Sequence, residues 1–310
     1  DQTISSNPIR PVGFEFASLK NNELLTPEKM NNTNLQMNFY QIKLPKGICY
    51  STGDVIEILP ENPPELVDKV IESLKLDPEQ VYRVVTNDSS IDSFIPEKVT
   101  TRQLFSQYLD LNGSPSRSIF RAFLEVSNAE GIERLAKMLD VNQSEEVLNY
   151  LKDVSTSEFI CEFSKYGIPT IEVIVSCCPH MKPRTYFIGS SPMRNQNMVN
   201  LIVTKRKFGK KMNRKGLCTS YLDDSELKKI PIRITQGSFE MPESRHAPIV
   251  MVAIGCGIAP MLSIIQNKGS QNGPIILVFG STSPKVHGKL IEELNKEKES
   301  MLFLFEWFLI

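Results

Sequence analysis

The chain has 310 residues and a net charge of -1, with 41% apolar and 23% charged residues. This length exceeds the usual size of one domain, so we expect one large domain or two ordinary ones in a globular protein. The balanced charge gives no reason to expect nucleic-acid binding. Six cysteines without a C-x-x-C pair, and only three histidines, argue against a metal site and against a secreted disulfide framework. We expect reduced thiols and a cytoplasmic location.

The sequence begins DQTISSNPIR, with neither a signal peptide nor an initiator methionine, so we expect it to start inside a longer protein. Alternation of apolar and polar residues at 34–43 and 54–60 predicts two half-buried strands. Residues 63–76, PPELVDKVIESLKL, place apolar side chains at helical spacing behind two prolines. From about 98 to 178 the apolar residues fall mostly at intervals of three and four, which predicts a helical block inserted into a strand-rich protein.

Strand patterns return at 184–190, 198–204 and 230–235. From about 248 a buried strand, a glycine turn, a short helix ended by Gly269 and a second buried strand follow in succession, which indicates a parallel α/β sheet. The terminal run MLFLFEWFLI is about half a membrane span long and is expected to be a buried strand separated from the remainder of its domain. We expect no membrane span. The predicted fold is an antiparallel β-barrel with a helical insertion, followed by the opening of an α/β nucleotide domain.

Two stretches that contain glycine could bind phosphate groups. GCGIAP, at 255–260, follows an apolar strand and precedes a helix, so Gly255 and Gly257 would let the backbone approach a phosphate or ribose closely. RKGLCTSYL, at 214–222, could begin a helix whose amides and hydroxyls hold a pyrophosphate. Alone, the first also fits an ordinary strand-to-helix turn, and the second a helix cap without a ligand. The basic run at 205–215 fits either a solvated hairpin or a site for a phosphate-bearing ligand or an acidic partner.

The stretch RTYFIGSSP, which begins at Arg184, has the composition of a flavin clamp. Arg184 offers the planar fork that suits phosphate oxygens, and Tyr186 offers a ring that could lie against the flavin. Taken singly, each residue fits equally well as a surface arginine or as a core or rim tyrosine. Phe187 stands where such a clamp is expected to carry a hydroxyl.

The order RTYF, KGLCTSYL, GCGIAP and VFGS resembles the motif order of the ferredoxin-NADP reductase superfamily, and the helical insertion narrows the resemblance to the diflavin reductases. GDVIEILPENPPELVDKVIESLKLDPEQVY, TRQLFSQYLDLNGSPSRSIFRAFLEV and IRITQGSFEMPESRHAPIVMV are most similar to the diflavin reductases of cytosolic iron–sulfur assembly. The likeness covers almost the whole chain. It implies an FAD-binding FR-type barrel at 1–245 with the connecting insertion at about 98–178, and an incomplete NADP-binding α/β domain at 246–310.

The resemblance also implies cofactor-binding residues. Those for FAD are the arginine of SPSRSIF, the flavin clamp and the pyrophosphate loop: Arg117, Arg184, Thr185, Tyr186, Phe187, Gly216, Leu217, Cys218 and Thr219. Cys256, between Gly255 and Gly257, falls on the threonine that contacts the nicotinamide nucleotide in the family. There NADPH gives a hydride to FAD, and electrons pass singly through FMN to an acceptor protein.

Several positions depart from the family pattern. The clamp ends in Phe187 where the family has a serine whose hydroxyl lies near the flavin N5, so no catalytic residue is assigned. Cys256 replaces the threonine of GTGIAP, and Ser281 and Thr282 replace the cysteine and arginine of FGCR. The family's 2′-phosphate grip aligns with the last two residues, and its catalytic cysteine and aspartate, its terminal aromatic shield and its upstream FMN domain are not found in this sequence. FAD binding is expected to survive these departures better than NADPH turnover.

Three hypotheses fit the sequence. The first is a module that takes electrons from NADPH through FAD to an FMN, flavodoxin-like domain and then to an anamorsin-type iron–sulfur protein or another redox acceptor, such as a haemoprotein. The second is a degenerate or truncated flavin-binding or interaction protein without efficient NADPH oxidation. The third, an unrelated barrel protein without a cofactor, leaves the motif order unexplained. The electron acceptor and the oligomeric state stay open.

Overall fold

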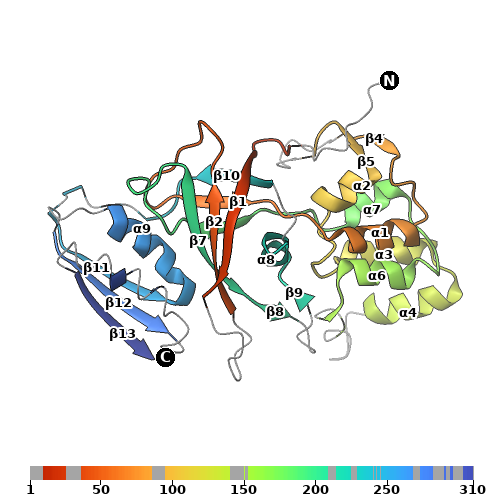
Figure 1. Cartoon of the computed structure of the whole chain (residues 1–310). Coiled ribbons are helices and arrows are strands. Elements are labelled where there is room, and N and C mark those ends of the chain that lie inside the picture. The colour runs from red at the N-terminus through yellow and green to blue at the C-terminus, as the bar shows by residue number, and fades with distance from the viewer. Residues whose placement is uncertain are drawn as a thin grey trace. The chain divides into compact units, whose positions relative to one another are not determined.

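The computed structural model describes residues 10–25, 36–85, 95–139, 150, 153–208, 214–224, 229–239, 241, 243–244, 246–267, 273–281, 290, 294–295 and 303–309. The chain divides into two compact units. Unit 1 comprises Asp1–Gly13, Leu59–Pro183 and Phe208–Tyr221, and unit 2 comprises Phe14–Ile58, Arg184–Lys207 and Leu222–Ile310. Figure 1 labels the helices and strands of both units, and each unit is described by itself.

Unit 1 is mostly helical, and its helices from α2 to α7 lie in the stretch of about 98–178 that was expected to be helical. Its elements are α1 (Pro64–Ser73), β4 (Val81–Arg83), β5 (Lys98–Thr100), α2 (Thr101–Gln103), the π-helix η1 (Leu104–Tyr108), α3 (Arg117–Val126), α4 (Ala129–Leu139), α6 (Thr156–Phe163), α7 (Ile171–Cys177), β9 (Arg214–Lys215) and α8 (Leu217–Leu222). Helix α6 begins at a capping box, because the Ser155 hydroxyl accepts from the Glu158 amide while the Glu158 carboxylate accepts from the Ser155 amide. None of the described helices is long and apolar enough to span a lipid bilayer.

An aromatic cluster joins α3 to α6 in the core of unit 1. The Phe159 ring is fully buried, and its centroid lies 4.3 Å from that of Phe120, 5.4 Å from that of Phe123 and 4.7 Å from that of Phe163. Phe120 and Phe123 project from α3 three residues apart, while Phe159 and Phe163 project from α6 four residues apart, so each pair lies on one helix face. The two faces interlock through Phe159.

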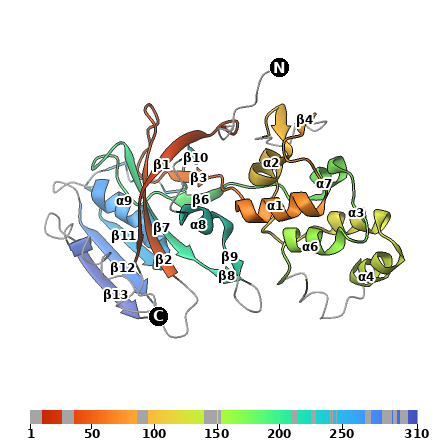
Figure 2. The same ribbon diagram turned by 45° about the vertical axis from the view of Figure 1, so that its right-hand side comes forward.

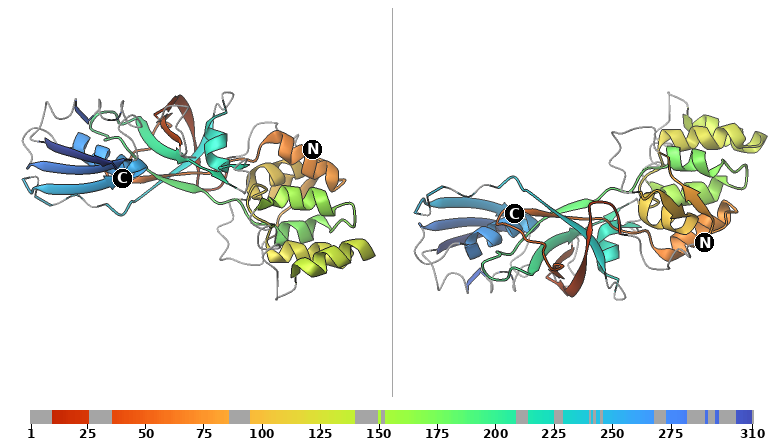
Figure 3. Two further views of the ribbon diagram at one scale, coloured as in Figure 1. Left: turned by 90° about the horizontal axis from the view of Figure 1, so that it is seen from below. Right: turned by 90° about the horizontal axis from the view of Figure 1, so that it is seen from above.

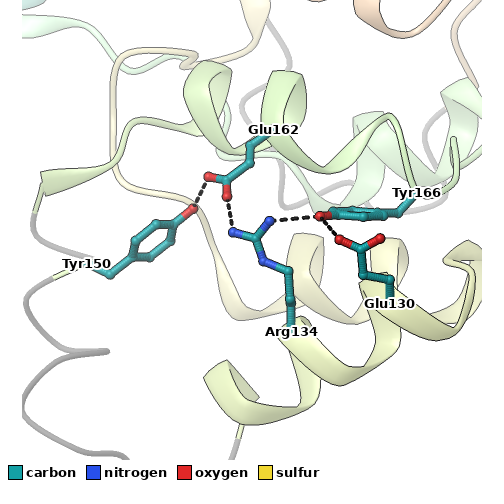
Figure 4. Close-up of polar contacts among 5 residues, drawn as sticks. All are labelled: Glu130, Arg134, Tyr150, Glu162 and Tyr166. Carbon is teal, nitrogen blue, oxygen red and sulfur yellow. Dashed lines mark hydrogen bonds and ion pairs between the residues drawn. The ribbon is translucent and has the colours of Figure 1, made fainter.

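A polar network lies beside this cluster and links α4 to α6 (Figure 4). The Arg134 guanidinium donates to the Glu162 carboxylate and, at 2.8 Å, to the Tyr166 hydroxyl. Tyr166 donates onward to Glu130, and Tyr150 donates to the other oxygen of Glu162 at 2.8 Å. Burial, and then the Glu162 carboxylate, raise the pKa of Tyr150 above its ordinary value, so this hydroxyl keeps its proton. The network therefore connects α4 to α6 through polar side chains.

Unit 2 is built on a six-stranded antiparallel sheet. Its strands are β1 (Glu15–Leu24), β2 (Gln36–Lys43), β3 (Val55–Ile58), β6 (Arg184–Phe187), β7 (Met198–Lys205) and β10 (Ile230–Thr235), in the order β6-β3-β10-β1-β2-β7. Buried pairs across β2 and β7, such as Tyr40 with Leu201 and Ile42 with Val199, form part of the core. The predicted strands at 34–43, 54–60, 184–190, 198–204 and 230–235 are all present in this sheet.

The sheet has β6 and β7 as its two edge strands. Within the described residues no ladder joins these two edges, but just beyond β6 the Gly189 amide donates to the Asn200 carbonyl of β7 at 2.7 Å. The edges therefore meet at one point. Closure of the sheet into a barrel stays a prediction. The basic run at 205–215 includes the short strands β8 (Lys207–Phe208) and β9, which pair as a two-stranded sheet.

The last part of unit 2 is a parallel sheet, as the sequence predicted. It consists of β11 (Ile249–Ile254), β12 (Ile275–Ser281) and β13 (Phe303–Leu309), which lie side by side in that order (Figure 3). Between β11 and β12 come the 3-10 turn η2 (Gly255–Ile258) and helix α9 (Ala259–Asn267). The terminal apolar run forms the predicted strand, and the burial of its side chains lies outside the described residues, as does the predicted helix end at Gly269.

Helix α9 packs between the parallel sheet and strands β2 and β7 (Figure 2). Every residue from Ala259 to Ile265 is buried, as expected of a helix covered on all sides. The prediction of a wholly buried first strand is wrong for one face of β11, where Val250, Val252 and Ile254 are each about two-thirds exposed. Leu290, from the connection that follows β12, joins the same core cluster as α9.

Phe159→Ala is expected to lower the free energy of unfolding by about 3–5 kcal/mol, because it leaves a cavity at the centre of the aromatic cluster. Val126→Ala, at a position on α3 that is 42% exposed, is the matched control and should cost far less. Urea unfolding followed by tyrosine and tryptophan fluorescence and by circular dichroism measures both. Similar losses for the two variants would show that Phe159 does not hold α3 and α6 together.

Candidate functional site

Strand β6 carries the predicted flavin clamp, and its pleat divides the four residues between two faces. Arg184 and Tyr186 are half-buried and share one face, whereas Thr185 and Phe187 are exposed and share the other. The register with β3 fixes this arrangement, because Arg184 and Tyr186 both pair with isoleucines of that strand. The structure therefore brings the predicted phosphate-binding arginine and the predicted ring platform to the same side, and it places Phe187 on the other.

Phe187 forms an exposed aromatic pair with Phe239. The side chains are 38% and 36% exposed, and the rings meet edge to face with their centroids 5.3 Å apart. The backbone near this pair is too close for any residue but glycine, since a Cβ on Gly237 would lie 1.8 Å from the Gly53 oxygen and one on Gly53 would lie 2.4 Å from the Phe239 oxygen. The pair presents apolar surface and offers no hydrogen-bond donor. A lone aromatic in QGSFEMP gave no signal of this partner in the sequence.

Ser190 and Ser191, which follow the end of β6 at Phe187 by three and four residues, tie the clamp strand to α9. The Ser190 hydroxyl accepts from the Asn200 amide at 3.0 Å and lies 3.2 Å from the Tyr50 hydroxyl, whose pKa is raised by burial. The Ser190 carbonyl accepts from the buried Ser263 hydroxyl of α9 at 2.8 Å. The Ser191 amide donates to the Gln266 side chain at 3.1 Å. Sequence patterns did not single out these polar contacts, and all but the one with Asn200 join residues far apart in the chain.

The predicted nucleotide turn, GCG, forms η2 at the start of α9. Gly255 has φ +54, in the left-handed region that favours glycine, so a residue with a Cβ would be strained at this position. A Cβ built on Gly255 or on Gly257 would meet nothing within 4 Å, so the backbone here faces open space that a ligand could enter. Cys256 is partly exposed between them, and Pro260 lies in the first turn of α9 as predicted.

In unit 1, Arg117 occupies the first position of α3 and its side chain is exposed. The preceding residue, Ser116, caps the helix by accepting from the Ile119 amide at 3.2 Å, and its hydroxyl donates to the Cys177 carbonyl at 2.6 Å. Arg117 therefore projects from a fixed helix start. A cation at this end of a helix gains nothing from the helix dipole.

The predicted pyrophosphate loop immediately precedes and begins α8, as its sequence suggested. The Gly216 carbonyl accepts from the Ser220 amide and from the Thr219 hydroxyl, each at 2.9 Å. The side chains of Leu217, Cys218 and Thr219 are buried. The Thr219 proton is thus used within the loop, and the loop offers a ligand its backbone amides rather than the hydroxyl donor that the sequence suggested.

One loop of unit 1 joins the two predicted FAD-binding segments of that unit. Residues 110–116 lead directly into Arg117, and the same loop receives the strand that leads into Gly216. The Arg214 guanidinium donates to the Asn112 carbonyl at 2.9 Å, while the Asn112 side chain donates to the Lys215 carbonyl at 3.4 Å. Two segments about a hundred residues apart in sequence are therefore neighbours. Arg214 was not among the predicted site residues.

Comparison with known proteins identifies the family. Residues 13–221 match the FAD binding domain family. The chain is 28% identical over 261 residues to the NADPH-dependent diflavin oxidoreductase 1 of Danio rerio, covering 76% of this chain and 42% of that protein. It is 30% identical over 284 residues to the protein of the same name from Arabidopsis thaliana, covering 86% and 45%. It is also 28% identical to the bifunctional cytochrome P450/NADPH--P450 reductase 2 of Bacillus subtilis, covering 93% and 28%.

The chain belongs to the FAD binding domain family, in the form found in the diflavin reductases. The matched residues 13–221 include the start of α3, strand β6 and the Gly216 loop. The chain spans less than half the length of the three relatives named above.

Arg184→Ala is expected to weaken FAD binding by about 10- to 100-fold, since a hydrogen bond to a charged group contributes about 1.5–3 kcal/mol. Arg206→Ala is the matched control, because this exposed arginine follows β7. Lys205 is unsuitable as a control since its amine pairs with Asp223 at 2.6 Å. Fluorescence titration of the apoprotein with FAD gives both dissociation constants, and equal effects would make Arg184 an ordinary surface residue.

Proposed function

We propose that this chain is the reductase module of a diflavin enzyme, an oxidoreductase that moves electrons from NADPH through FAD toward an FMN domain. The observation that carries the proposal is the half-buried Arg184–Tyr186 pair on one face of β6, inside a stretch that matches the FAD binding domain family. Relatives named NADPH-dependent diflavin oxidoreductase 1 and NADPH--cytochrome P450 reductase support both cofactors.

Each predicted segment has a distinct part in holding the cofactors. Arg184 supplies a guanidinium to the FAD phosphates and Tyr186 a ring surface to the flavin. The backbone amides of the Gly216 loop hold the pyrophosphate, and Arg117 adds a cation from α3. The open backbone of the Gly255–Gly257 turn receives the nicotinamide nucleotide. When bound, FAD supplies the ring that accepts a hydride from NADPH.

We further propose that the six-stranded sheet closes into a flavin-binding barrel that ends near residue 245, and that residues 246–310 belong to an NADP-binding α/β domain. The bond from Gly189 to Asn200, which links the two edge strands, supports closure. The first boundary is supported by β10, which belongs to the six-stranded sheet and ends at Thr235, and the second by the parallel β11-β12-β13 sheet. In this arrangement the helical stretch at about 98–178 is an insertion into the barrel domain.

The partners of the whole protein are inferred from its relatives. An FMN, flavodoxin-like domain would take electrons one at a time from FAD and pass them to an acceptor. The acceptor is an anamorsin-type iron–sulfur protein if the chain acts as the iron–sulfur assembly reductases do, and otherwise another redox protein, such as a haemoprotein. The relative from Bacillus subtilis is named a bifunctional cytochrome P450/NADPH--P450 reductase, which supports a haemoprotein as the alternative acceptor. A cytoplasmic location fits the six free thiols.

A second function, flavin binding without efficient NADPH oxidation, is favoured by one observation. Phe187 occupies the position where a hydroxyl is expected, it packs on Phe239, and neither ring can donate a hydrogen bond. The Arg184–Tyr186 face is unaffected by this substitution because it lies on the opposite side of the strand. Binding and hydride transfer can thus be separated in this chain.

FAD, and not FMN, is expected to be released when the purified chain is denatured, because the proposed site assigns two arginines and the Gly216 loop to the phosphates of a dinucleotide. Reconstitution of the apoprotein with excess FAD or FMN, followed by gel filtration and chromatographic identification of the released flavin, measures this. FMN serves as the control, since it has the same ring but lacks the adenylate half. Retention of neither flavin would contradict the proposal.

Phe187→Ser is expected to speed anaerobic reduction of the bound FAD by NADPH, since Phe187 is the last residue of β6 and is proposed to border the edge of a flavin whose ring plane rests on Tyr186. A hydroxyl donor aimed at developing negative charge contributes on the order of 10²–10³ in rate. Phe187→Ala is the matched control, because it removes the same bulk and adds no hydroxyl. Stopped-flow absorbance measures the rate, and dithionite should reduce all three proteins fully. If the alanine variant is as fast as the serine variant, the missing hydroxyl is not the defect.

A further inference from the structure

Arg214 is held in an unusual way for a surface arginine of a basic hairpin. One guanidinium nitrogen donates to the Asn112 carbonyl at 2.9 Å and another to the Asp153 carbonyl at 3.2 Å. Its Nε is buried and has no hydrogen-bond partner. Among the described residues no carboxylate forms an ion pair with it. The side chain therefore uses its planar fork to grip the main chain at two points.

Both acceptors lie in backbone that is hydrogen-bonded to the start of α6 or adjoins it. The Asp110 carboxylate accepts from the amides of Asn112 and Gly113, at 3.2 and 2.8 Å, which folds the loop at 110–116 into a tight turn. The Gly113 carbonyl in turn accepts from both the amide and the hydroxyl of Thr156 at the start of α6. Asp153 comes just before the capping box that begins this same helix. The guanidinium is thus hydrogen-bonded to backbone that adjoins the start of α6.

The opposite side of this contact is the proposed pyrophosphate loop. Arg214 and Lys215 form β9, and Gly216 follows at once. The Asn112 side chain donates to the Lys215 carbonyl at 3.4 Å. The residues just before Gly216 are therefore bonded to Asn112 twice, once by the Arg214 side chain and once by the Asn112 side chain. A loop whose amides bind a phosphate has a higher affinity when its backbone is already ordered, because the free-energy cost of ordering the loop does not then reduce the binding free energy.

We propose that Arg214 and Asn112 form a clasp that positions the Gly216–Thr219 loop for the FAD pyrophosphate, with Arg214 acting as a positioning residue through its two main-chain hydrogen bonds. This proposal rests on the proposed function, since it takes FAD as the ligand. Arg214 itself does not touch the phosphate. It sets the place of the amides that do, and its effect comes from the geometry of the fork more than from the charge.

The test is the FAD dissociation constant of Arg214→Met, measured by fluorescence titration of the apoprotein. The expected result is a rise of about tenfold, equal to about 1.4 kcal/mol. Lys215→Met is the matched control, because it removes the same charge from an exposed side chain one residue nearer the loop. The Lys215 main-chain carbonyl, which accepts from Asn112, is kept in this variant. It should change the constant by less than about twofold. The Arg214→Met effect should persist at 1 M salt, where the screening length is about 3 Å.

Arg214→Lys keeps the charge but loses the fork, so it is expected to recover little of the lost affinity, and it decides the matter if Arg214→Met does not fold. Wild-type affinity in Arg214→Lys would overturn the proposal, as would equal losses in Arg214→Met and Lys215→Met, or a loss that vanishes at high salt. Failure of the unchanged chain to bind FAD would sink the proposed function itself. FAD binding that is normal in the chain and unaltered in both Arg214 variants would sink this inference alone.

Discussion

The pairing of β3 with both β6 and β10 is the constraint on which the rest of this structure depends. Ile58, the last residue of β3, lies opposite Arg184, the first residue of β6. The chain leaves the sheet at one member of this pair and returns at the other, after passing through the whole of residues 59–183. A helical unit can therefore be inserted without disturbing the ladder. The same pairing sets the position of Arg184 and the faces of the clamp strand.

The two faces of β6 separate the residues suited to FAD binding from Phe187, the residue at which hydride transfer is expected to be impaired. Arg184 and Tyr186 share the half-buried face, and this is the part of the motif suited to holding a dinucleotide. Phe187 lies on the exposed face against Phe239, and the glycine contacts between residues 53 and 237 keep the chain close at that point. A substitution on one face of a strand leaves the other face intact. The chain can thus keep the affinity of its family while its rate of hydride transfer falls.

Local pattern was enough to predict many of the elements. Alternation located β2 and β7, three-four spacing located the helical block, and the apolar run before GCGIAP located β11, because each pattern reports which face of an element is buried. The same reasoning failed on one face of β11, where Val250 is exposed. The exposure of a strand face depends on which distant segments pack against it, and no local pattern contains that information.

The candidate site was predictable only as separate segments. The motifs predicted Arg184, Tyr186 and the Gly216 loop, because an arginine and the free amides of a glycine turn both suit phosphate groups. They did not give Ser190 with Ser263, or Arg214 with Asn112, since these contacts join residues that lie roughly 70 to 100 positions apart. Their donors meet main-chain carbonyls, which every residue has. A hydrogen bond to a carbonyl leaves no trace in the sequence of its acceptor.

A crystal structure of the chain with FAD tests the central claim most directly, namely that the Arg184–Tyr186 face of β6 is the ligand face. We expect a phosphate oxygen about 2.7–2.9 Å from the Arg184 guanidinium, the flavin ring against Tyr186, and no hydrogen bond from the Phe187 side. FAD bound against Thr185 and Phe187, or bound with Arg184 far from both phosphates, would contradict it.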